Sequence, residues 1–137
     1  MVDEKSCGAI VYNEEGKILV VQHNAGHWDF PKGHVENGET EIETATREVK
    51  EETNIDIEII DEKYRYTIYY SPKENVNKMV VFFLAKNKSE DTIKQDAEIK
   101  NIGWYSYDEA MDILTYNDAK KLLKMSYDDY TTIKGEI

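Results

Sequence analysis

The sequence predicts an α/β or α+β fold built around a mixed β-sheet. Short runs of β-branched and aromatic residues flank one strong helical segment, and further helical segments close the chain. With 137 residues, of which 40% are hydrophobic, the chain can bury the core of one compact domain. We therefore expect a single domain over residues 1–137.

The first half of the chain predicts two strands and a helix. Residues 6–12 and 17–22 are β-branched runs, and Asn13-Glu14-Glu15-Gly16 between them is typical of a hairpin turn. Residues 40–53 are rich in Glu, Lys, Ala and Arg, which favour a helix.

The second half predicts three strands and two helices. Residues 55–70 and 77–86 have strand composition, and a short strand is expected around Ile102–Tyr105. Helical stretches follow at 107–115 and 117–125, with Ser106 or Asp108 as the candidate cap of the first. The resulting order of elements predicts a mixed sheet.

Composition excludes several classes of function. The net charge of −11 disfavours a long nucleic acid as partner, although a small anion can bind through a cation. No window approaches about 18 consecutive apolar residues, so no membrane span is expected. The chain has a single cysteine, Cys7, and no leader-like N-terminus. We expect a soluble cytoplasmic protein, as a monomer or a homodimer.

The helix at 40–53 carries an unusual group of acids. On the 3.6-residue period three apolar residues share one stripe and three glutamates share the next, namely Ile42, Ala45 and Val49 beside Glu48, Glu51 and Glu52. Carboxylates this close repel one another unless protons, basic side chains or a metal compensate. Their oxygens select hard cations, Mg²⁺ first and Mn²⁺ next. Such a helix is more often a solvated face, and the spacing alone does not decide.

The residues around the three glutamates favour a metal site over a solvated helix face. Residues 33–55 resemble the Nudix box, G-x5-E-x7-R-E-U-x-E-E-x-G-U, in which U is aliphatic. The matching positions are Gly33, Glu39, Arg47, Glu48, Val49, Glu51, Glu52 and Ile55. Asn54 stands where the family has glycine; Asn tolerates the left-handed conformation that a helix cap at this position requires, so activity should survive.

This resemblance implies an α/β/α sandwich with a mixed β-sheet and a metal-dependent pyrophosphohydrolase. In the family, water attacks a phosphorus of a nucleoside diphosphate derivative while divalent metals sit on the helix glutamates. By carry-over, Glu48, Glu51 and Glu52 would bind Mg²⁺, with Mn²⁺ as the possible substitute, and the Lys32 backbone carbonyl would be a further ligand. Arg47 would orient the glutamates, and Glu39 would support the loop before the helix.

Residues 27–36 are similar to the stretch that precedes the box in asymmetrical diadenosine tetraphosphate hydrolases, where Trp and Pro-Lys-Gly-His-Val-Glu recur. The implied substrate is a dinucleoside polyphosphate, cleaved to a nucleoside triphosphate and a monophosphate. Lys32 would meet phosphate, and Phe82 and Tyr116 would stack on a base. The competing interpretations are a core residue for Phe82 and a surface aromatic for Tyr116.

Three further residues are weaker candidates. Glu98 lies where the family places a late acid that serves as metal ligand or general base, although it can equally be a solvated loop carboxylate. His34 either touches phosphate or hydrogen-bonds within its loop. Lys78 could meet the outer phosphates of a long polyphosphate.

Other functions remain open at this point. A sibling enzyme would be an oxidised-nucleotide or nucleoside triphosphate pyrophosphatase, or a 5′-end RNA pyrophosphohydrolase, which the acidic charge disfavours. A catalytically idle Nudix domain that binds a nucleotide belongs to another class, and the intact set of glutamates argues against it.

Overall fold

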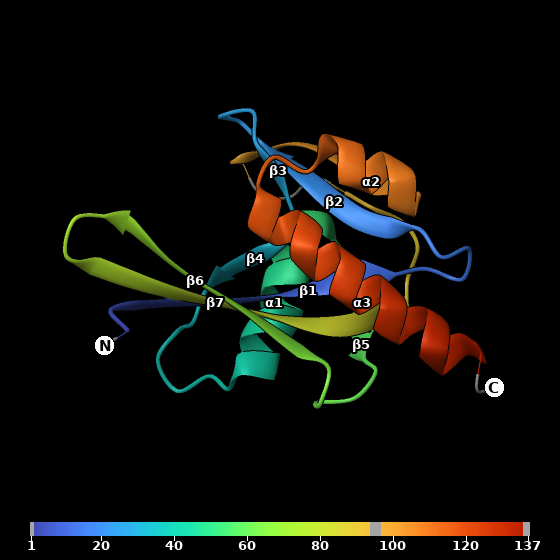
Figure 1. Cartoon of the computed structure of the whole chain (residues 1–137), viewed down its shortest axis with the longest axis horizontal. Helices are drawn as coiled ribbons and strands as arrows, with labels where there is room; N and C mark the ends of the chain where they lie inside the picture. The colour runs from blue at the N-terminus through green and yellow to red at the C-terminus, as the bar shows by residue number, and fades with distance from the viewer. Residues whose placement is uncertain (1, 94–96, 136–137) are drawn as a thin grey trace.

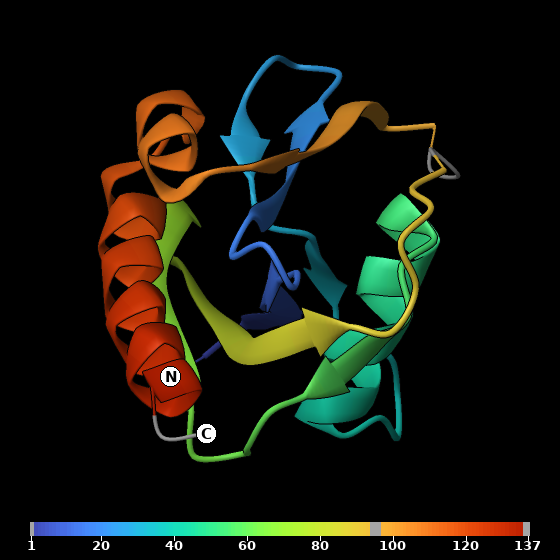
Figure 2. The ribbon, with the colours of Figure 1, turned by 90° about the vertical axis from the view of Figure 1, so that its right-hand side faces the viewer.

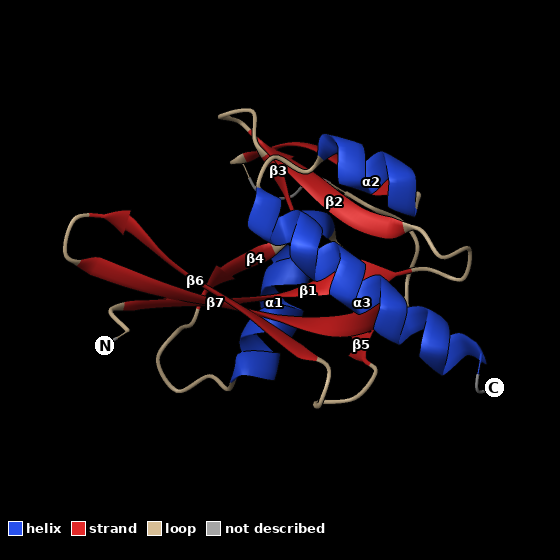
Figure 3. Ribbon diagram, viewed as in Figure 1, coloured by secondary structure: helices blue, strands red, loops and turns tan. Residues whose placement is uncertain are grey.

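A mixed β-sheet with helices on both faces forms the fold (Figures 1 and 3). The computed structural model describes residues 2–93 and 97–135. Within them, the sheet contains β1 (Glu4–Tyr12), β2 (Ile18–His23), β3 (Trp28–Asp29), β4 (Lys32–His34), β5 (Ile57–Ile59), β6 (Arg65–Lys73), β7 (Val76–Asn87) and β8 (Ile99–Tyr105). The helices are α1 (Glu41–Thr53), α2 (Tyr107–Ile113) and α3 (Asn117–Gly135). Figure 2 shows α1 and α3 on opposite sides of the sheet, so the expected α/β/α sandwich is confirmed.

Strands β1 and β7 form the centre of the sheet and run parallel, with Glu4 opposite Lys78 and Tyr12 opposite Lys86. Parallel strands are usually buried on both faces, and accordingly residues 6–12 of β1 are buried without a break. The first half of β1 pairs on its other side with β4, and its end pairs with β2. Among the described strands β4 pairs with β1 alone, so its outer edge has no strand partner.

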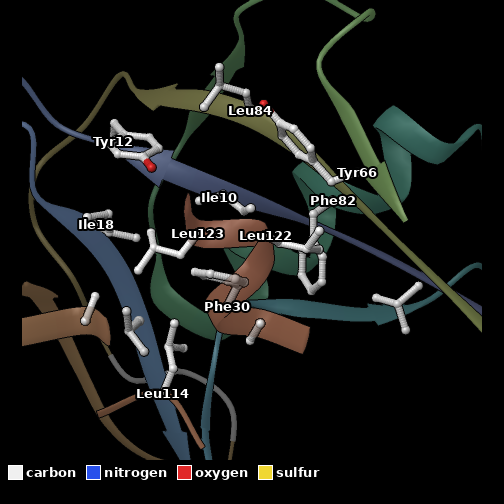
Figure 4. Packing of buried hydrophobic residues seen from close by; sticks show 14 residues of the cluster. Ile10, Tyr12, Ile18, Phe30, Tyr66, Phe82, Leu84, Leu114, Leu122 and Leu123 are labelled. Atoms are coloured by element: carbon white, nitrogen blue, oxygen red, sulfur yellow. The ribbon is translucent and has the colours of Figure 1, made fainter. Parts of the chain in front are cut away.

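Two apolar layers fill the space on either side of the sheet. The layer beneath α2 and α3 includes Ile10, Tyr12, Phe30, Phe82, Leu84, Leu122 and Leu123 (Figure 4). The layer beneath α1 includes Cys7, Ala9, Val11, Ala45, Val49, Val81 and Ala85. Successive residues of β1 and β7 alternate between the layers because side chains in a strand point to opposite faces.

Helix α1 begins and ends as its sequence predicts. The Thr40 hydroxyl accepts from the Glu43 amide while the Glu43 carboxylate accepts from the Thr40 amide, which is a capping box. At the other end Asn54 adopts φ 70° and donates its N–H to the Lys50 carbonyl. The expectation that Asn54 replaces the family glycine as a left-handed cap is therefore confirmed.

Other boundaries differ from the sequence prediction. The segment 55–70 is not one strand but β5 and the start of β6, because a turn at Asp61, whose carboxylate accepts from the Lys63 amide, separates them. Helix α3 continues from residue 125 to 135. Its added turns are held by Asp129, which accepts from the Tyr66 hydroxyl at 2.6 Å, and by Tyr130, which stacks on Tyr12 with ring centroids 4.2 Å apart.

The remaining differences are smaller. Strand β8 starts at Ile99 rather than near 102, because it pairs with β2 from His23 onwards. Helix α2 ends at Ile113. The short strands β3 and β4 were not expected, since two or three residues carry no detectable periodicity.

An ionic cluster on the α1 face generates a prediction about stability. Glu41 accepts from Arg65 at 2.7 and 2.8 Å and pairs with Lys5, and the Arg65 guanidinium lowers its pKa to about 2 from 4.5. The lowered folded-state pKa means that ionised Glu41 stabilises the fold above about pH 4.5, and that this stabilisation is lost as the pH falls towards 2. We expect Glu41→Gln to lower the free energy of unfolding by about 2 kcal/mol at pH 7.

Urea unfolding of both proteins between pH 7 and pH 3 checks this. The difference between them should shrink as the pH falls, whereas Glu74→Gln, a change at an exposed turn residue, should leave stability unchanged. A difference that is independent of pH would contradict the assignment.

Candidate active site

Arg47 is the hub of the charged residues around α1. Its guanidinium donates to Glu39 at 2.7 and 2.9 Å, to Glu48 at 2.6 Å and to Glu51 at 3.1 Å. It also donates to the backbone carbonyl of His34 at 3.0 Å. The hydrogen bonds from Arg47 lower the pKa of Glu39 to about 2. One cation thus joins β4, the following loop and the acidic stripe of the helix.

The three glutamates of the stripe differ in exposure. The Glu51 side chain is 54% exposed and that of Glu48 only 13%, while residue Glu52 is 5% exposed. Glu48 lies directly against Gly33 of β4, where a Cβ atom would overlap its carboxylate. Glu48 and Glu52 therefore lie at the margin of the core, and the close approach of Glu48 requires glycine at position 33.

The candidate metal ligands on α1, Glu48, Glu51 and Glu52, suit a hard divalent cation. All three are carboxylates, and Cys7, the single cysteine of the chain, is buried with a pKa raised to about 11 by desolvation. In the described part of the chain, however, no three acidic, histidine or cysteine side chains are grouped as a finished metal site. Arg47 bonds to one carboxylate oxygen of Glu48 and to one of Glu51.

A cavity of about 310 Å³ lies on the other face of the sheet, beside the start of α3. It is lined by His27, Asp29, Lys32, Ile68, Tyr70, Val80, Phe82, Tyr116, Asp118 and Ala119. The structure thus brings together Lys32, Phe82 and Tyr116, which the sequence singled out separately. Phe82 is a buried core residue and also part of the cavity wall. Its ring contacts the Phe30 ring edge to face, with the ring centroids 5.4 Å apart (Figure 4). Tyr116 is 51% exposed.

The register of the sheet places two of the cavity residues in line. Phe82, Gly8 and Lys32 lie in one row across β7, β1 and β4. Gly8 contributes no side chain between the other two, and a Cβ there would overlap the Pro31 carbonyl. The neighbouring residue Gly33 faces α1 instead. Adjacent residues of β4 therefore border the cavity on one face and the acidic stripe on the other.

The cavity wall contains a buried carboxylate and a lysine in contact. Asp29 is 8% exposed, and its Oδ2 atom lies 3.8 Å from the Lys32 ammonium. Burial raises the pKa of Asp29, and Lys32 opposes that shift. Lys78, two residues before Val80 on the same face of β7, has a pKa lowered by burial and then by Lys32. The two lysines therefore lie within electrostatic reach of each other.

The other candidates lie outside the cavity. His34 is exposed at the end of β4, and its contact with Arg47 is made by its backbone carbonyl. Glu98 is exposed just before β8, and its backbone carbonyl accepts from the Asn24 amide. After β7, the Ile93 amide donates to the Thr53 carbonyl at the end of α1 (Figure 2).

Besides its apolar residues, the cavity has four residues that were not recognised as site residues in the sequence: His27, Asp29, Tyr70 and Asp118. The His27 ring stacks on His23 at 4.3 Å and lies 5.9 Å from the Tyr116 ring. His27 and Asp29 are in the segment that resembles the diadenosine tetraphosphate hydrolases, so that resemblance could have indicated them. Tyr70 and Asp118 reach the cavity through long-range packing, which has no local sequence pattern.

The family assignment follows from comparison with known proteins. The family model for the NUDIX domain matches residues 3–125, and the chain belongs to the Nudix family. It is a hydrolase that acts on phosphorus-containing anhydrides. Enzymes of this family generally use divalent metal ions. Among the described residues no helix is both long and apolar enough to cross a membrane.

Two relatives and one solved structure are similar to this chain over most of its length. The chain is 35% identical to the asymmetrical bis(5′-nucleosyl)-tetraphosphatase of Caenorhabditis elegans, over 88% of this chain and 91% of the relative. It is 31% identical to the Sus scrofa protein of the same name, over 88% and 90%. The crystal structure of a C. elegans Ap4A hydrolase binary complex superposes with a TM-score of 0.82 at 31% identity, covering 94% of this chain and 98% of that one.

The contact between Gly33 and Glu48 generates a prediction. Because a methyl group at Gly33 would occupy the space of the Glu48 carboxylate, we expect Gly33→Ala to lower the rate of anhydride hydrolysis by at least about tenfold. Steady-state assays and thermal unfolding of the same samples check this. Gly135→Ala, whose added carbon would have no atom within 4 Å, is the matched control and should hydrolyse at the wild-type rate. Full activity of Gly33→Ala would contradict the role of this contact.

Proposed function

We propose that the protein is a cytoplasmic Mg²⁺-dependent hydrolase that splits diadenosine tetraphosphate asymmetrically. One water molecule is consumed, and the products are ATP and AMP. The observation that carries the proposal is the arrangement at β4, where a cavity of nucleobase size and an acidic helix stripe border adjacent residues of one strand. The identity to two asymmetrical tetraphosphatases over most of both chains supports this choice of substrate.

In this proposal the cavity binds one adenosine. Phe82 and Tyr116 are aromatic residues of its wall, and His27 lies beside Tyr116. Stacking of a base on an aromatic ring contributes about 1–3 kcal/mol per contact and needs no base-specific hydrogen bond. The apolar wall residues Ile68 and Val80 exclude water from the base.

The polyphosphate would leave the cavity past Lys32 and cross the edge of β4 that has no strand partner, towards α1. Lys32 borders the cavity, and Lys78 lies on the same face of the sheet. His34, exposed at the end of β4, is within the same strand as Lys32 and would be a further phosphate contact. These cations offset the charge of the substrate in a chain whose net charge is −11.

Glu48, Glu51 and Glu52 would hold the metal on α1, with the Lys32 backbone carbonyl as a further ligand. Bound Mg²⁺, for which Mn²⁺ can substitute, would neutralise phosphate oxygens and lower the pKa of the attacking water. Arg47 would keep the carboxylates oriented and limit their mutual repulsion. Glu98 would serve either as a late metal ligand or as the base that accepts the proton from water.

The first test is hydrolysis itself. We expect purified protein with Mg²⁺ to convert diadenosine tetraphosphate to ATP and AMP, measured by anion-exchange chromatography. Glu52→Gln should lower kcat by at least about a hundredfold, because it removes a buried ligand charge. Glu58→Gln, which changes an exposed carboxylate on β5, is the control and should retain full activity. Two ADP molecules as product, no turnover, or full turnover by Glu52→Gln would each refute the proposal.

A second test concerns the adenosine site. Because Tyr116 offers a stacking face, we expect Tyr116→Ala to raise KM for diadenosine tetraphosphate roughly 5- to 100-fold with little change in kcat. Tyr69→Ala is the matched control, since Tyr69 is 65% exposed and lies on the opposite face of β6 from Tyr70. Equal KM values for the two variants would remove Tyr116 from the site.

A further inference from the structure

Asp29 is a buried carboxylate in the cavity to which the proposed function gives no role. It lies in β3, lines the cavity and is 8% exposed. Its Oδ1 atom accepts from the Phe30 amide at 2.8 Å, so the backbone fixes the position of the carboxylate. Burying a charge is costly unless a partner compensates, and such a residue is rarely kept without a contribution to structure or function.

The partner that compensates Asp29 is Lys32, which lines the same cavity. The second oxygen, Oδ2, lies 3.8 Å from the Lys32 ammonium, and the Lys32 side chain is only 21% exposed. Lys78 is the second ammonium near this point and interacts electrostatically with both Lys32 and Asp29. One fixed carboxylate therefore lies near two half-buried ammonium groups that repel each other.

We propose that Asp29 is a positioning residue that holds the Lys32 ammonium at the cavity wall, ready for the substrate phosphates; this rests on the proposed function. The reason is the flexibility of lysine, whose four-carbon side chain loses considerable entropy when it is fixed in one place. A carboxylate that is itself fixed by the backbone lowers this cost before the substrate arrives. It also prevents repulsion by Lys78 from moving Lys32 out into solvent.

The sign of the effect separates this role from its alternatives. If Asp29 positions Lys32, its removal weakens phosphate binding even though a negative charge is lost. If Asp29 only repels the substrate phosphates, its removal strengthens binding. If Asp29 only supports the fold, its removal has the same effect whether or not Lys32 is present.

A double-mutant cycle on Asp29 and Lys32 tests the proposal. Asp29→Asn keeps the size of the side chain and an oxygen for the Phe30 amide, so the fold should tolerate it. The dissociation constant for ATP is measured by calorimetry in EDTA, which leaves metal ions out of the readout, and KM and kcat for diadenosine tetraphosphate are measured with Mg²⁺. We expect Asp29→Asn to raise Kd and KM about five- to tenfold and to change kcat less than about twofold.

The effect of Asp29→Asn in the absence of Lys32 distinguishes a positioning role from a purely structural one. In protein that already carries Lys32→Met, the further change Asp29→Asn should alter Kd by less than about twofold, because the Lys32 ammonium that Asp29 positions is already gone. Asp29→Glu should recover part of the wild-type affinity. Asp56→Asn is the matched control: Asp56 lies 3.2 Å from the Lys50 ammonium on the surface, and its removal should change neither constant.

The outcomes separate the two proposals. Wild-type protein that neither binds ATP nor hydrolyses diadenosine tetraphosphate refutes the proposed function, and the role of Asp29 with it. If the wild-type protein is active, three results would refute the role of Asp29 alone. In these results Asp29→Asn leaves the Kd for ATP unchanged, lowers it, or raises it equally with and without Lys32.

Discussion

The site depends on one physical constraint, which is the neutralisation of several carboxylates by a single guanidinium. Glu48 and Glu51 lie close together on α1, and Glu39 approaches from the preceding loop. A planar group with five donors can satisfy carboxylates from different directions at once, which an ammonium cannot do with the same geometry. Arg47 therefore links the loop to the helix, because one guanidinium bonds both to Glu39 and to two glutamates of α1.

The central strands place the rest of the site. Because β1 is buried on both faces and pairs with β7 and β4, residues of one strand contribute to both layers. Lys32, which borders the cavity, and Gly33, which lies against Glu48, are consequently neighbours in sequence but lie on opposite faces. Under the proposed function, a substrate that reaches both has to be extended, as a polyphosphate is.

The sequence predicted the local parts of this structure well. The acidic stripe, the Ser106 cap of α2 and the left-handed Asn54 depend on residues within a few positions of one another. The cavity could be predicted only in part, since Phe82, Tyr116 and Lys32 were identified by resemblance rather than by contact. Tyr70 and Asp118 were missed, because nothing near them in sequence indicates that β6 and α3 meet the same space. The length of α3 was likewise set by distant partners, Tyr12 and Tyr66.

The close approach at Gly33 has a consequence for how this protein can change during evolution. The distance from the sheet to the Glu48 carboxylate is set by backbone against side chain, with no packed residue between them. The apolar residues beneath α1, such as Ala45 and Val49, can then exchange for others of similar volume while the acidic stripe keeps its place. Volume-conserving substitutions in this part of the core should therefore leave the position of the acidic stripe unchanged.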